Sequence, residues 1–403
     1  MNLSYFISKR ISREQQEGFS STIHKIAMTS IAIGLGASII AFLIMHGFQE
    51  TVKSKIYSFS GHLLVTPYTI TNTPLNFKVD AFANQGKYTL IKHIQEYALK
   101  VGLVKTEDEE VLGVSVKGVG KSFDQETFRS SIIDGRFLDF PDSSYAHQVV
   151  LSKTISEKLN ANVGDDIVVH FFQNPPRYRK LQVVGIYETN LSEYFDDKVI
   201  FSDIRMIQKL NDWNDSLADG LEVFVKDVNR IDDAGYQLAD AIPAELNIER
   251  VSDLYMQVFE WLHLLSRQVN ILLGIILTVV CVNMISIVLI LVMERTQMIG
   301  MLKALGAGDR LIRSVFIYNG VNLIFKGLLL GNILGLGLCY LQYKFGIMKL
   351  NAHDYYMSVV PISWHWEVVI ALNLITFFVV TTVLLLPTLI IARISPIKAI
   401  RFD

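Results

Sequence analysis

The chain has 403 residues, of which 51% are hydrophobic and only 19% are charged. A soluble domain usually carries about 25% charged residues, so this composition excludes an entirely soluble enzyme and a disordered chain. The net charge of −2 provides no basic surface for nucleic acid, and we expect no nucleic-acid partner.

Four apolar stretches predict membrane-spanning helices at 25–48, 267–293, 315–345 and 366–391. Each is about 20 residues or longer, enough to cross a hydrocarbon core of roughly 30 Å. We therefore expect a membrane protein of four transmembrane α-helices, with a large α+β extracytoplasmic domain inserted between helices 1 and 2. The only two cysteines, Cys281 and Cys339, fall in predicted spans, so the domain folds without disulfides.

The basic residues of the short loops predict the orientation, because cytoplasmic loops are enriched in Lys and Arg. These residues gather in 1–24, 294–314 and 392–403, so we expect both termini to be cytoplasmic. The segment 1–24 is predicted to form an amphipathic helix along the inner membrane surface. The domain at 49–266 and a short loop at 346–365 then lie outside.

Two spans carry rows of small residues at four-residue spacing, a pattern that lets helices approach closely. The rows are Ser30, Gly34, Ser38, Gly327, Gly331 and Gly335. They fit either packing among the four helices of this chain or contact with a second permease chain. Lys326 in the third span either snorkels to the inner interface or takes part in transport.

The outer domain alternates short β-branched runs with helical patterns, and it joins the membrane through two helical stalks. The first span continues outward as a helix to about residue 56, and an apolar stripe over 251–265 predicts the returning stalk. We predict strands at 62–66, 110–117, 148–151, 166–171, 181–187, 198–201 and 221–225. We predict helices near 82–99, 153–159, 203–210 and 231–241.

Signatures of catalysis or cofactor binding do not stand out. The segment 115–122 resembles a phosphate loop, but Ser115 stands where that motif needs its first glycine. His353, Asp354 and His365 match no metal-ligand spacing. We predict no catalytic residue, no cofactor and no metal site, and we expect the chain to catalyse nothing alone.

A short cytoplasmic helix between the second and third spans presents apolar and basic residues together. It contains Met298, Ile299, Leu302, Lys303, Leu305 and Gly306. An apolar face on this side of the membrane either docks on a partner protein or packs back on the chain itself.

Three segments resemble the LolC/LolE lipoprotein-releasing permeases, members of the type VII ABC permeases that include FtsX-like and MacB-like proteins. They are residues 19–64, ERTQMIGMLKALGA at 294–307 and PIKAIRFD at 396–403. The resemblance implies a bacterial inner-membrane subunit that extracts lipoproteins together with a separate LolD-like ATPase, which binds the cytoplasmic helix in a surface groove. It also implies a second permease chain, identical or not, contact with membrane lipids, and a LolA-like periplasmic carrier.

Residues 171–195 are similar to the part of LolC/LolE in which a loop recruits that carrier. The corresponding residues here are Asn174, Pro175, Pro176, Arg177, Tyr178 and Arg179, although an ordinary basic hairpin loop would look the same. Two alternative functions stay open within the superfamily. One is an FtsX-like mechanical transmitter that activates a cell-wall hydrolase, and the other is a MacB-like efflux permease.

Overall fold

The computed structural model describes residues 19–68, 75–76, 88–105, 110–142, 144–191, 195–240, 242–243, 245–351 and 355–389. The predicted amphipathic helix up to residue 18, the tail at 392–403, and His353 and Asp354 lie outside these residues. The chain divides into two compact units. One contains Met1–Glu50, Trp261–Lys349 and Val359–Asp403, and the other contains Thr51–Glu260 and Leu350–Ser358.

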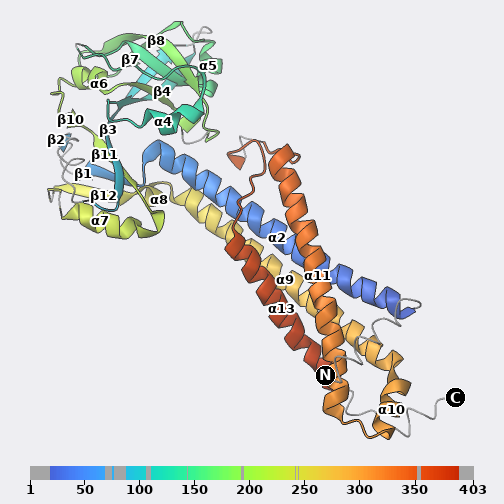
Figure 1. The fold of residues 1–403 in the computed structure, drawn as a ribbon. Coiled ribbons are helices and arrows are strands. Elements are labelled where there is room, and N and C mark those ends of the chain that lie inside the picture. The colour runs from blue at the N-terminus through green and yellow to red at the C-terminus, as the bar shows by residue number, and fades with distance from the viewer. Residues whose placement is uncertain are drawn as a thin grey trace. The chain divides into compact units, whose positions relative to one another are not determined.

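Four of the described helices are long and apolar enough to cross a membrane. They are α2 (Phe19–Ser60), α9 (Met256–Glu294), α11 (Asp309–Phe345) and α13 (Trp366–Thr388) (Figure 1). A short helix, α10 (Thr296–Ala304), connects α9 to α11. The long helices share one hydrophobic core, in which Ile31, Leu35 and Ile39 of α2 are buried against residues of α9, α11 and α13.

Glycines set the contact between α11 and α2. A methyl group added at Gly327 would lie 2.8 Å from the Cβ of Ile31, and one at Gly335 would lie 3.1 Å from the backbone oxygen of Gly36. Real Cβ atoms rarely approach so closely, so the absence of side chains allows these two backbones to pack together. The α11 row of small residues therefore packs within this chain.

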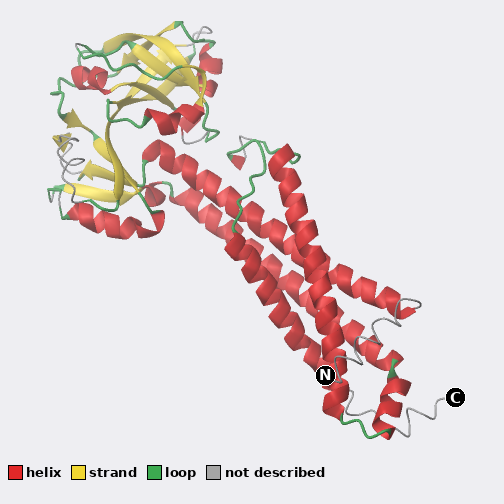
Figure 2. Cartoon of the chain, viewed as in Figure 1, coloured by secondary structure: helices red, strands yellow, loops and turns green. Residues whose placement is uncertain are grey.

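The second unit is built on a ten-stranded sheet in the order β12-β1-β11-β3-β4-β9-β6-β8-β5, with β7 paired to β3 and β8 (Figure 2). The strands are β1 (Leu63–Pro67), β3 (Ile91–Lys105), β4 (Val111–Val119), β5 (Ile132–Gly135), β6 (Gln148–Ser152), β7 (Asp166–Phe171), β8 (Arg177–Tyr187), β9 (Val199–Asp203), β11 (Gly220–Val225) and β12 (Leu246–Arg250). A separate pair joins β2 (Leu75–Asn76) to β10 (Leu217–Ala218). Most neighbours are antiparallel, but β4 pairs with β9 and β6 with β8 in parallel.

Short helices cover this sheet and complete its core. They are α4 (Gln125–Phe128), α5 (Lys153–Leu159), α6 (Ile204–Leu210), α7 (Ile231–Ala239) and α8 (Val251–Leu254). Buried residues form two clusters, one over β4, β6, β8 and β9 and the other over β1, β11 and α7. The fold class expected from the sequence, four membrane helices with an α+β domain between the first and second, is confirmed.

All seven predicted strands occur, and three of the four predicted helices occur as α5, α6 and α7. The helix predicted near 82–99 is wrong. From Ile91 onward the chain forms β3, and residues 82–87 lie outside the described part. The segment is rich in helix-favouring residues, yet it lies between β11 and β4 in the sheet. Pairing on both sides outweighs the intrinsic preference.

Candidate functional site

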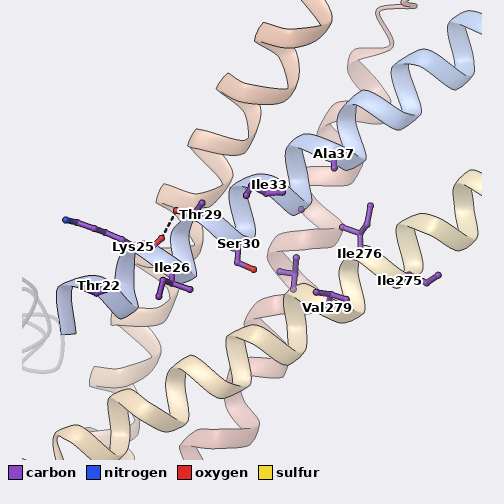
Figure 3. A pocket seen from close by; sticks show the side chains of 12 residues that line it. Thr22, Lys25, Ile26, Thr29, Ser30, Ile33, Ala37, Ile275, Ile276 and Val279 are labelled. Carbon is purple, nitrogen blue, oxygen red and sulfur yellow. Dashed lines mark hydrogen bonds between the residues drawn. The ribbon is translucent and has the colours of Figure 1, made fainter. Parts of the chain in front are cut away.

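An open apolar groove of about 640 Å³ lies between α2 and α9 in the membrane unit (Figure 3). Its walls are aliphatic over most of their length, because Ile26, Ile33 and Ala37 line one side and Ile276 and Val279 the other. Gly34 lies at the base, where an added methyl group would lie 2.5 Å from the side chain of Val280. The absence of a side chain at Gly34 lets α9 approach α2 closely, and the aliphatic walls suit a hydrocarbon chain.

The polar lining residues Thr22, Lys25, Thr29 and Ser30 all come from the first half of the α2 wall. The Asn283 amide donates a hydrogen bond of 3.0 Å to the Ser30 hydroxyl and joins the two helices. Lys25 is exposed beside Thr22 and Thr29, and the Thr29 hydroxyl donates to the Lys25 carbonyl at 2.7 Å. The groove therefore has an apolar body and a cationic end, a distribution that matches an amphiphile.

Part of the predicted small-residue row of α2 lies at the contact between α2 and α9. Ser30 and Gly34 line the groove facing α9, and the buried Ser38 hydroxyl donates to the Gly34 carbonyl at 2.8 Å. Lys326 is exposed on α11. A row of small residues predicts that another helix packs closely against it, but it does not identify that helix. The partner helices of the two rows were therefore found only from the structure.

Helix α10 divides its residues between two surroundings. Ile299 is fully buried, and Met298 and Leu302 pack on the same core cluster of the membrane helices. Leu305, at the end of the helix, is 80% exposed, and Met301 is exposed as well. Lys303 pairs with Asp309 at 2.9 Å, and Gly306 takes a φ of +92° that ends the helix. The free apolar surface is thus Met301 and Leu305.

The predicted carrier loop is shorter than expected. Asn174, Pro175 and Pro176 lie in the connection between β7 and β8, but Arg177, Tyr178 and Arg179 are the first residues of β8 and pair with β7. The sequence prediction that all six form a loop is therefore wrong. Proline ends a pairing ladder, whereas the alternating Arg-Tyr-Arg run suits a strand edge.

The side chains of Arg177 and Arg179 are not free in solvent at the end of a loop, as the sequence predicted. Arg177 donates to the carbonyls of Lys209 and Leu210 at the end of α6 and forms an ion pair of 3.0 Å with Asp212. Arg179 is partly buried, and its Nε has no hydrogen-bond acceptor among the described residues. Arg177 therefore stabilises the domain itself.

Aromatic residues instead form the accessible surface at this place. Tyr178 is 66% exposed and Phe172 is also exposed, and both line an apolar pocket of about 340 Å³ with Leu103 and Val111. Exposed apolar pockets of this kind are typical of protein-binding surfaces. We name Phe172, Tyr178, Leu103 and Val111 the aromatic patch.

A buried ion pair at the outer end of α2 escaped the sequence analysis. The Lys117 ammonium donates to the Glu222 carboxylate at 2.5 Å and to the Phe59 carbonyl at 2.7 Å, and it lies 4.7 Å from the centre of the Phe59 ring. Gln95 donates to the other oxygen of Glu222 at 2.7 Å. Lys117 is 4% exposed, so the last turn of α2 is held by a desolvated charge. Strand alternation gave no signal for it, because Lys117 shares a face of β4 with the exposed Gly113 and the half-buried Ser115 and not with the buried Val114 and Val116.

Two family models match the chain. The MacB-like periplasmic core domain matches residues 26–241, more than half of the chain, and the FtsX-like permease C-terminal matches residues 270–396. The first region covers most of the first membrane helix and most of the outer domain, and the second covers the second, third and fourth membrane helices.

The chain is also similar to named permeases over nearly its whole length. It is 22% identical to the lipoprotein-releasing system transmembrane protein LolC of Neisseria meningitidis, covering 97% of this chain and 96% of LolC. It is 22% identical to LolE of Haemophilus influenzae, covering 91% of each. The crystal structure of the periplasmic region of MacB from Actinobacillus actinomycetemcomitans superimposes with a TM-score of 0.36 at 14% identity, over 49% of this chain and 91% of that one.

The family matches and the named relatives agree with the four apolar helices and with the sheet domain between the first two of them. On this combination, the chain belongs to the family of LolC/LolE-type ABC transporter permeases, inner-membrane proteins with a MacB-like periplasmic domain and an FtsX-like C-terminal region.

Proposed function

We propose that this permease extracts lipoproteins from the inner membrane and passes them to a periplasmic carrier, driven by a separate LolD-like ATPase. The observation that carries the proposal is the groove between α2 and α9, because its apolar body fits an acyl chain. The similarity to proteins named as lipoprotein-releasing supports the same cargo. A second permease chain, identical or not, closes the groove from the opposite side.

In this proposal both termini and α10 lie in the cytoplasm. The exposed Met301 and Leu305 of α10 form the apolar contact for the ATPase, while Ile299 anchors the helix to the membrane core. Burying two apolar side chains in a partner surface stabilises the contact by about 1.5–3 kcal/mol each. ATP-dependent states of the partner then act on the membrane helices by binding α10 differently.

The carrier contact is the aromatic patch. Tyr178 and Phe172 supply a large accessible apolar area, which suits recognition of a soluble protein better than Arg177, whose donors are already occupied. Aromatic residues dominate the energetics of protein interfaces.

Photocrosslinking in intact cells tests cargo and carrier together. A photoreactive residue at Ile33, which is 60% exposed in the groove, is expected to capture acylated lipoproteins, and one at Tyr178 a soluble carrier. The matched control is Ile370, 58% exposed on α13, which does not line the groove. Equal capture of lipoproteins at Ile33 and Ile370 would contradict the groove assignment. Capture of a cell-wall hydrolase at Tyr178, with lipoproteins sorted normally when Ile33 is changed to Trp, would favour a mechanical transmitter.

A further inference from the structure

The segment that leads into α13 lies across α2 within the membrane unit. The Ser363 N–H donates to the Leu43 carbonyl at 3.3 Å. A methyl group added at Gly47 would lie 2.8 Å from the Pro361 carbonyl oxygen, so the two backbones are in direct contact. We name residues 361–365 the strap. The strap attaches the start of α13 to α2.

Three side chains at this contact form a closed triangle. The His365 Nε2 lies 3.1 Å from Glu50 Oε1, the Ser363 Oγ lies 2.5 Å from Glu50 Oε2, and the Ser363 Oγ lies 2.9 Å from His365 Nδ1. All three separations are hydrogen-bond distances. Because a hydrogen bond needs one proton between its two heavy atoms, the closed triangle requires three protons.

A neutral imidazole and an ionised carboxylate leave this triangle one proton short. The serine hydroxyl carries one proton, the neutral imidazole carries one, and the carboxylate carries none. One of the three contacts would then place two lone pairs against each other. The closed triangle therefore holds an added proton, shared by Glu50 and His365. An imidazolium facing a carboxylate and a neutral imidazole facing a carboxylic acid have the same proton count, so the proton belongs to the pair.

The other ionisable groups around the triangle come from four helices. They are His46 of α2, His263 and Arg267 of α9, Tyr343 and Lys344 of α11, and Glu367 of α13. The rings of His46 and His365 lie 5.2 Å apart, centre to centre. The other five side chains are exposed. Among the described residues, Glu50 is the ion-pair partner of His365, so its carboxylate balances the added proton.

We propose that Glu50, Ser363 and His365 form a proton-binding latch that regulates the contact between the strap and α2. At acidic pH the added proton closes all three contacts, and at alkaline pH one contact opens and the strap is held less firmly. Histidine suits this role because it ordinarily changes charge between about pH 5 and 8. The latch is independent of the lipoprotein cargo, so it stands or falls separately from the proposed function.

Hydrogen exchange of the full-length chain in detergent, followed by mass spectrometry of the strap peptide, tests the latch. The reporter is the Ser363 N–H, which is bonded to the Leu43 carbonyl. Rates at about pH 6 and pH 8 are expressed as protection factors, which remove the intrinsic pH dependence of exchange. In the unchanged chain we expect about tenfold higher protection at the lower pH, because one more hydrogen bond is made.

Glu50→Gln is the decisive variant. Its amide NH2 can donate to Ser363, the serine can donate to Nδ1 of His365, and the neutral imidazole can donate to the amide oxygen. The triangle then closes without an added proton, so protection at the higher pH should rise about tenfold. His365→Ala should instead lower protection at the lower pH and remove the pH dependence. His263→Gln changes an exposed histidine of α9 and should leave both values unchanged.

Any one of three results would overturn the latch. The unchanged chain could be protected equally at both pH values, Glu50→Gln could fail to raise protection at the higher pH, or His263→Gln could act like His365→Ala. A contact that served only packing would give the first two results. Melting temperatures establish that each variant is folded. Because Glu50→Gln is nearly isosteric, it decides the question even if His365→Ala does not fold.

Discussion

Single side chains at the junction of α2 and the sheet are tuned by burial. His62 lies two residues after the end of α2, stacks on Tyr57 with ring centres 4.4 Å apart, and accepts a hydrogen bond from the Val225 N–H through Nδ1. Burial, aided by the positive charge of Lys92, lowers the pKa of His62 to about 4 from its ordinary value of 6.5. The imidazole is therefore neutral in the folded protein, and its acceptor role depends on that state.

This predicts acid sensitivity between pH 6.5 and pH 4. In that window the unfolded chain binds a proton at His62 and the folded chain does not, so stability falls as the pH is lowered. His62→Gln is expected to reduce the slope of melting temperature against pH in this window. The exposed His170→Gln serves as control and should leave the slope unchanged. A slope that His62→Gln does not alter would show that other groups carry the acid sensitivity.

At the scale of elements, the buried ion pair of Lys117 and Glu222 joins β4, β11 and the last turn of α2. Lys117→Met is expected to lower the free energy of unfolding by about 3–5 kcal/mol, because Glu222 stays buried without a cation. Adding Glu222→Gln to Lys117→Met should restore much of that loss, since the amide is neutral and can still bond Gln95. Denaturant unfolding measures both variants.

The comparison for this prediction is Lys180→Met, which removes an exposed pair with Asp166 and should change stability little. If the single and double variants of Lys117 were equally unstable, the loss would come from packing around Phe59 and not from the charge on Glu222.

The sequence predicted the elements whose conformation follows from local pattern and missed those whose conformation comes from contacts distant in sequence. Periodicity found α5 and β7 with the bounds that the structure has, because local pattern and burial agree there. It failed at β3, whose composition favours a helix and whose conformation comes from pairing with β11 and β4. For α10 the sequence located the helix but not its orientation, so the burial of Ile299 and the exposure of Leu305 could not be separated. The buried pair of Lys117 and Glu222 joins strands distant in sequence and left no local signal.

At the scale of the whole molecule, the exposed end of α10 is the test of coupling to an ATPase. Leu305→Arg is expected to leave the chain inserted and folded, because the side chain is 80% exposed. It should abolish copurification of the ATPase, since docking would bury an unpaired charge. Leu305→Met is the conservative control and should behave as the unchanged chain. Full copurification and normal lipoprotein release with Leu305→Arg would disprove the proposed contact.

The glycine contact between α11 and α2 has a consequence for motion. With backbones touching at Gly335 and Gly36 and with Ile31 filling the space over Gly327, neither helix can rotate about its axis without collision. The two helices therefore form a rigid pair, and changes of shape in the membrane unit are confined to its other contacts. Helix α9 also approaches α2 closely at Gly34, but the groove beside this contact leaves space between the side chains of the two helices. In a transport cycle of this protein, α2 and α11 would then keep their mutual position while α9 moves relative to them.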